Sequence, residues 1–165
     1  HFLFALLRAE EWPIFLQECW RVTRPGGYVR LTEPEWGLTT SSALEQLSRL
    51  FLRGLQQRGQ SFSPDDRHLG MILHLSFFLE GAGWTEITRR ASVQEYGRGP
   101  QLPHDPALRV ELITRELRPV ILEEGIATQQ EVEQLMRKAA EEVGREDFCG
   151  LQFLLSVCGR RPEAS

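Results

Sequence analysis

The segment Arg21-Val-Thr-Arg-Pro-Gly-Gly constrains the fold of this chain more than any other. Arg21 and Arg24 suit the last turn of a helix, where cations interact favourably with the negative end of the helix dipole. Pro25 cannot continue that helix, and Gly26 or Gly27 can adopt the positive φ that a tight reversal requires. The segment therefore predicts a helix that ends and a chain that turns back sharply.

Both sides of this turn carry a secondary-structure signal. Residues 10–23 begin with acids and Pro13 and carry a broad apolar face, which predicts a helix. Residues 28–33 are β-prone, and we expect Pro34 to end that strand. The turn thus joins a helix to a strand, as in an α/β sheet.

The rest of the chain alternates between helical and strand patterns. We expect helices over residues 42–58, 63–80, 106–124 (bent near Pro119) and 128–143, and strands over 84–96 and 148–159. The hydroxyls of Thr39 to Ser42 can cap the first of these helices. Thr128 and Glu131 have the spacing of a capping box.

Composition excludes several classes of protein. The 165 residues suit one domain, and a net charge of −4 argues against a general nucleic-acid binder. No apolar run reaches the length of a membrane span, so we expect no membrane partner. The three cysteines do not suggest a disulfide framework, which makes the reducing cytoplasm the expected location.

The turn and the strand after it resemble a known enzyme family. The pattern Glu18-x-x-Arg21-Val22-x-Arg24-Pro25-Gly26-Gly27 is similar to the segment that leads into the fifth strand of class I S-adenosylmethionine-dependent methyltransferases, of the small-molecule type. Gly81-Ala82-Gly83-Trp84 before a strand, and the block from Gly125 to Val132 before the last strand, resemble further segments of that family. The resemblance covers most of the chain.

The resemblance implies a fold and a division of the chain. We expect one α/β domain over residues 1–165, the C-terminal half of a Rossmann-like mixed sheet that ends in an antiparallel pair. Residues 37–82 and 98–146 would be helical inserts that act as lids over the substrate. The family's glycine-rich turn after a first strand is not found here, so we expect the half that binds S-adenosylmethionine to be missing from this chain.

Several residues are candidates for contact with ligands. The resemblance places His1 and Phe2 in a loop on the cofactor side. Glu33, Glu35 and Trp36 follow the strand at its carboxyl end, where open α/β sheets bind ligands. They could contact substrate or handle a proton, or they could belong to a loop that caps a helix, and the sequence favours neither.

Histidines add one further candidate and no metal site. His74 lies in a strongly apolar helix, where packing in the core is the usual role and a substrate pocket is the alternative. His68 and His74 are six residues apart, whereas metal-binding pairs on a helix favour three or four, so we expect no metal.

The expected function is methyl transfer from S-adenosylmethionine to a small-molecule acceptor, with this chain alone inactive. One alternative is a non-catalytic α/β interaction module, or an inactive fragment, that a homo-oligomer or partner stabilises by covering an exposed sheet edge. Another Rossmann-like enzyme, such as a reductase, is a third possibility. The sequence does not identify the substrate or the methylated atom.

Overall fold

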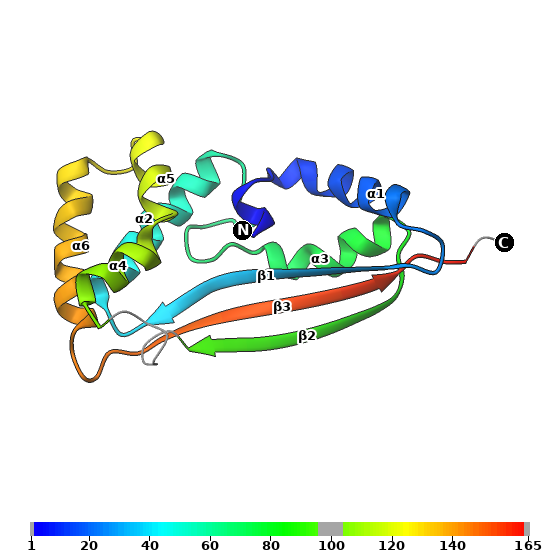
Figure 1. The fold of residues 1–165 in the computed structure, drawn as a ribbon. Helices are drawn as coiled ribbons and strands as arrows, with labels where there is room; N and C mark the ends of the chain where they lie inside the picture. The colour runs from blue at the N-terminus through cyan, green and yellow to red at the C-terminus, as the bar shows by residue number, and fades with distance from the viewer. Residues whose placement is uncertain (1, 96–103, 164–165) are drawn as a thin grey trace.

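Three long strands form one antiparallel sheet in the computed structural model, which describes residues 2–95 and 104–163 (Figure 1). The strands are β1 (Tyr28–Thr39), β2 (Thr85–Glu95) and β3 (Gly150–Arg160). Their order is β1-β3-β2, so the last strand of the chain lies between the two earlier ones. β3 is antiparallel to both neighbours, and within the described residues the sheet has no parallel pair.

β1 is longer than the sequence predicted, because Pro34 does not end it. Pro34 pairs with Leu154, and the strand continues to Thr39 with an irregularity after Glu35. The carbonyl of Gly27 accepts from Arg161 N–H across the β1–β3 pair (2.8 Å). Because the residues of an antiparallel strand alternate in the side to which their N–H and C=O groups point, odd-numbered β1 residues bond to β3 and even-numbered ones face the other, free edge. The missing N–H of Pro34 therefore breaks no bond to β3, as is usual for proline in an edge strand.

Two helices cover one face of the sheet, and four others gather at one end of it (Figure 1). α1 (Trp12–Val22) and α3 (Met71–Gly81) pack on the sheet, and their shared core contains Leu16, Leu75 and Val157. The bundle consists of α2 (Ser42–Gln57), α4 (Pro106–Thr114), α5 (Leu117–Glu123) and α6 (Gln129–Val143). A second core fills the bundle. The predicted insert 37–82 thus begins inside β1 and contributes helices to both cores, and residues 98–103 of the other insert lie outside the described part.

α3 begins eight residues later than the sequence predicted. The Ser63 hydroxyl accepts from Asp65 N–H (3.3 Å) and lies 2.9 Å from His68 Nδ1, which are bonds of a local turn. Gly70, the residue before the helix, has φ of +74°, so no helix can run through it. The predicted start at residue 63 is therefore wrong, because Ser63 belongs to a local turn and the helix begins at Met71.

The other boundaries follow the sequence closely. The predicted helix over 106–124 is two helices, and its break falls at residues 115–116, so that Pro119 lies in the first turn of α5, where proline is tolerated. Gly26 has the expected positive φ (+72°). The predicted caps form, because Ser41 Oγ accepts from Leu44 N–H (3.1 Å) and Thr128 makes a capping box with Glu131.

Candidate functional site

An apolar pocket of about 320 Å³ opens where the end of β1 meets the bundle. It is lined by four aromatic side chains, three aliphatic ones, and a few polar residues: Phe2, Phe4, Trp36, Gly37, Phe51, Gln94, Leu112, Ile113, Glu116, Leu117 and Gln152. A concave apolar site with a few polar groups is the usual form of a small-molecule site. We call this cavity the aromatic pocket.

The rings of the aromatic pocket come from three separate segments. Phe2 and Phe4 belong to the N-terminal 3₁₀ turn, and their ring centroids are 6.2 Å apart. Trp36 from β1 lies against Phe51 from α2, with a centroid distance of 5.1 Å and an interplanar angle of 50°. The β1 irregularity between Glu35 and Leu38 spans Trp36. Long-range packing therefore builds the pocket.

Glu33 fixes the wall of the pocket that Phe4 provides. Its side chain is 2% exposed, and its two oxygens accept from the N–H groups of Leu3 (3.0 Å) and Phe4 (3.2 Å). Burial raises the pKa of Glu33, and the two backbone hydrogen bonds offset only part of that effect. Glu33 thus connects β1 to the N-terminal turn and positions Phe4.

Glu35 holds a different segment. Its carboxylate accepts from the N–H groups of Leu69 (2.6 Å) and Gly70 (3.0 Å), directly before α3, and from Trp36 N–H (2.7 Å). Two of these bonds hold the residues directly before α3, so Glu35 ties that loop to β1. Of the two roles that the sequence left open for Glu33 and Glu35, this geometry favours the holding of loops.

The other sequence candidates lie in three different places. Trp36 and Phe2 line the aromatic pocket. His74 lies on α3 between Phe62 (centroids 4.9 Å apart) and Phe78 (5.8 Å), and it does not line that pocket. His1 lies outside the described residues. Among residues 2–95 and 104–163, no three acidic, histidine or cysteine side chains are grouped to hold a metal ion.

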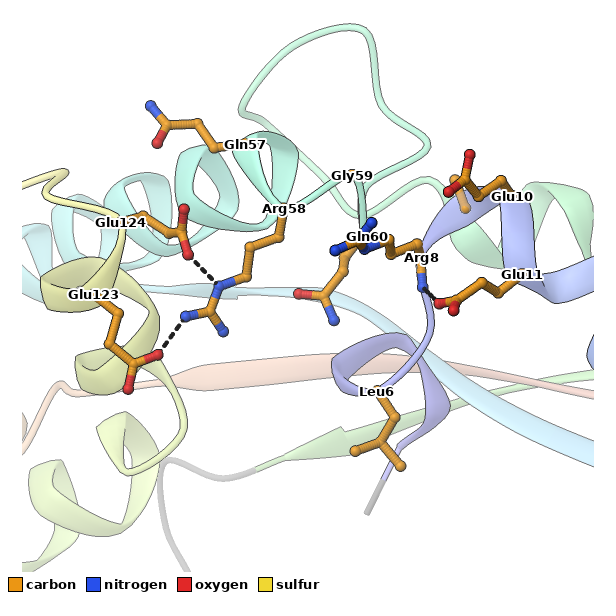
Figure 2. A pocket seen from close by; sticks show the side chains of 11 residues that line it. Leu6, Arg8, Glu10, Glu11, Gln57, Arg58, Gly59, Gln60, Glu123 and Glu124 are labelled. Carbon is orange, nitrogen blue, oxygen red and sulfur yellow. Dashed lines mark hydrogen bonds and ion pairs between the residues drawn. The ribbon is translucent and has the colours of Figure 1, made fainter.

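A second, larger hollow is polar and is occupied by its own ion pairs (Figure 2). Arg58 donates from Nε to Glu124 (2.7 Å) and from Nη2 to Glu123 (2.6 Å), and the pKa of Arg58 is raised chiefly by Glu124. Figure 2 also shows Glu11 accepting from the backbone N–H of Arg8 (2.7 Å). Because Arg58, one of the two arginines that line it, is already paired with two glutamates, this hollow is a weaker candidate for a ligand site than the aromatic pocket.

Sequence reasoning missed most of the aromatic pocket. Phe51 appeared only as one position on a helix face, and Phe4 only as part of an apolar run. Gln94 and Gln152 are cross-strand partners on β2 and β3, and that pairing cannot be read without the register. Two signals were available: an acidic-aromatic cluster at the carboxyl end of a predicted strand identified Trp36, and the family resemblance named Phe2, which it placed on the cofactor side.

Comparisons with known proteins add no relative. The sequence matches no protein-family model, and no curated protein matches it either. None of the described helices is long and apolar enough to cross a membrane. The chain is accordingly described by its α/β architecture and its pocket alone.

Proposed function

We propose that this chain forms the acceptor-binding part of an S-adenosylmethionine-dependent methyltransferase that acts on a small molecule with an apolar body. The observation that carries the proposal is the aromatic pocket, which lies at the carboxyl end of the strand launched by the Pro25-Gly26-Gly27 turn. Ligand crevices of open α/β sheets lie at that end of the strands. The turn is also the segment that resembles the methyltransferase family.

The strand order also supports the proposal. β3 inserts between β1 and β2 and is antiparallel to both, which agrees with a sheet that ends in antiparallel strands. The other edge of β1 has no partner strand among the described residues. A Rossmann-like sheet would continue from that edge.

The described residues do not by themselves fit S-adenosylmethionine. No closely spaced glycines follow β1 or β3 in the sequence, and Gly97 and Gly99, which follow β2, lie outside the described residues. Closely spaced glycines after a strand are how such folds bring backbone amides close to the ligand. Glu33 and Glu35, the two acids on β1, are engaged by backbone N–H groups and are not free to bind ribose hydroxyls. We therefore assign the acceptor to this chain and derive no step through the cofactor.

The contribution of these residues would be to bind and orient the acceptor. Phe4 and Phe51 are 8% and 2% exposed, so a ligand in contact with them is largely shielded from water. Holding an acceptor in one orientation removes much of the entropic barrier to a bimolecular step. Gln94 and Gln152 are uncharged hydrogen-bonding groups that can set that orientation.

Because the described residues contain no turn that would bind the cofactor, a second candidate function is a non-catalytic module that binds the same ligand. A thermal-shift measurement with S-adenosylhomocysteine separates the two. We expect a clear rise in melting temperature for the product of the full gene, since ligand at 100 times Kd stabilises by about 2.7 kcal/mol, and no rise for residues 1–165. Transfer of a labelled methyl group by the full product is the confirming assay. No shift and no transfer would leave the non-catalytic module.

A further inference from the structure

The aromatic pocket has an unbalanced charge. Among the described residues that line it, Glu116 is the only ionisable one, and none is a lysine, arginine or histidine. Among the residues that the structure describes, Glu116 takes part in no ion pair. Arg115 and Arg118 flank it in sequence but do not line the pocket, and Arg118 faces Glu133 at 3.9 Å. A carboxylate or phosphate ligand would meet the repelling charge of Glu116 and no cation from the described lining residues.

Apolar and charged surfaces occupy different depths of the pocket. Phe4, Phe51 and Leu117 are buried and form its inner wall, whereas Glu116 and Leu112 are exposed at the mouth. Glu116 directly precedes α5. A ligand that fills the cavity with an apolar body would therefore present its outer end to a carboxylate.

Aromatic walls add a second preference for positive charge. Phe2 is 36% exposed, and Trp36 is half-buried, so both rings are accessible to a ligand at the mouth as well as inside. Ring faces attract ammonium groups, by about 0.5–1 kcal/mol at exposed sites. The volume of about 320 Å³ is at the lower end for small-molecule sites and suits a molecule of one or two rings.

We propose that the aromatic pocket binds a small planar aromatic molecule that carries a protonated amine on a short chain, with the ring among Phe4, Trp36 and Phe51 and the ammonium group at Glu116. The identification of this arylalkylamine as a methyl acceptor rests on the proposed function; its binding does not. Molecules of the same shape that carry a carboxylate are disfavoured.

Three matched probes test the proposal on the 165-residue chain. Tryptamine, 3-ethylindole and indole-3-propionate share a ring and a two-carbon chain and differ in charge. Titration calorimetry at neutral pH and low salt should give the tightest Kd for tryptamine and the weakest for indole-3-propionate. We expect Kd to rise about two- to fivefold from tryptamine to 3-ethylindole and again from 3-ethylindole to indole-3-propionate, because exposed charge pairs contribute little. Added salt should reduce the differences.

Variants locate the effect. Glu116→Gln should remove the preference for tryptamine over 3-ethylindole, while Trp36→Ala should weaken all three probes. Glu111→Gln is the control, because Glu111 is an exposed acid on α4 that does not line the pocket, and it should leave every Kd unchanged. Melting temperatures of the variants identify any that fail to fold.

The proposal is overturned if no probe binds, if indole-3-propionate binds as well as tryptamine, or if Glu116→Gln keeps the preference. It is also overturned if Trp36→Ala changes no affinity, since the probes would then bind elsewhere. The two proposals can fail separately. If the probes bind in the predicted order but the full product transfers no methyl group, only the proposed methyltransferase function is refuted. If the full product transfers methyl groups only to neutral or acidic acceptors, only the proposed ligand class is refuted.

Discussion

Glu33 in the sheet and Glu142 in the bundle are shielded carboxylates that accept hydrogen bonds from a distant part of the chain. Among the described residues, Glu33 accepts from two backbone N–H groups, and its pKa is raised because burial dominates. Burial would also raise the pKa of Glu142, but bonds from Ala43 N–H and from the hydroxyls of Ser41 and Ser42, together with Lys138, lower it on balance. The number and charge of the donors decide the direction.

This difference reflects how the two regions are joined to the chain. Glu142, near the end of α6, binds the start of α2, where free backbone donors and the helix dipole favour an anion. Glu33 binds a three-residue 3₁₀ turn that offers little more than two N–H groups. A carboxylate that caps a long helix is stabilised in its charged form, whereas one that holds a short turn is not.

The prediction with the largest expected effect concerns whether the sheet core and the bundle core unfold together. Leu16→Ala in the sheet core and Ile121→Ala in the bundle core each remove a side chain that is fully buried, and each should lower the free energy of unfolding by about 2–5 kcal/mol. Since β1 contributes to both regions, we expect each variant to show one transition by circular dichroism. Ile14→Ala, at a position 68% exposed, is the control and should change stability by no more than about 0.5 kcal/mol. Two separate transitions in either variant would show that the regions are independent.

The next test removes one acceptor from each carboxylate. Glu33→Gln and Glu142→Gln place an amide NH₂ where an oxygen accepts, so we expect each to destabilise the protein by about 1–3 kcal/mol in urea titrations. Glu33→Gln should also increase hydrogen exchange at the N-terminal turn, and Glu142→Gln at the start of α2. An equal increase at both places in both variants would contradict the assignment of one segment to each carboxylate.

The loss of stability caused by Glu33→Gln and by Glu142→Gln should depend on pH in opposite directions. The lowered pKa of Glu142 gives stability that is present above the ordinary value of 4.5 and is lost as pH falls through the folded pKa. The raised pKa of Glu33 gives the opposite sign, with stability present below 4.5 and lost as pH rises through the folded pKa. The penalty of Glu142→Gln should therefore shrink toward about pH 3, while that of Glu33→Gln should shrink toward about pH 7. Penalties that change in the same direction would refute the comparison.

The smallest effects are expected at two local motifs, one in each region. Gly26→Ala forces a Cβ into a residue with φ of +72° and should cost about 1–2 kcal/mol. Thr128→Ala removes the cap of α6 and should cost about 1 kcal/mol. Melting temperatures of the two variants can be compared directly, and Thr128→Ser, which keeps the hydroxyl, should restore most of the loss. No change for Gly26→Ala would show that the turn tolerates a side chain.

How far the sequence predicted this structure depends on the range of the interactions. The Gly26 turn and the Thr128 cap are complete within a few residues, and both form as predicted. The partners of Glu33 and Glu35 are about 30 residues away, so their bonds could not be read from the sequence. The late start of α3 was missed because Ser63 has local partners and the φ of Gly70 depends on its surroundings.

The candidate site was less predictable for the same reason. Trp36 could be identified from its expected place after a strand, but the ring that it contacts comes from α2. The remaining walls come from α4, α5, the N-terminal turn, β2 and β3. A pocket made by so many segments has no local sequence signature.

Pro34 divides the free edge of β1 into two parts with different capacities for association. From Tyr28 to Thr32, alternate residues present both a donor and an acceptor to that edge, so another strand could extend the sheet there. At Pro34 the donor is missing, and an added strand would lose a hydrogen bond there. Pro34 is itself buried, so this edge is open to a neighbouring strand from Tyr28 to Thr32 and closed at Pro34.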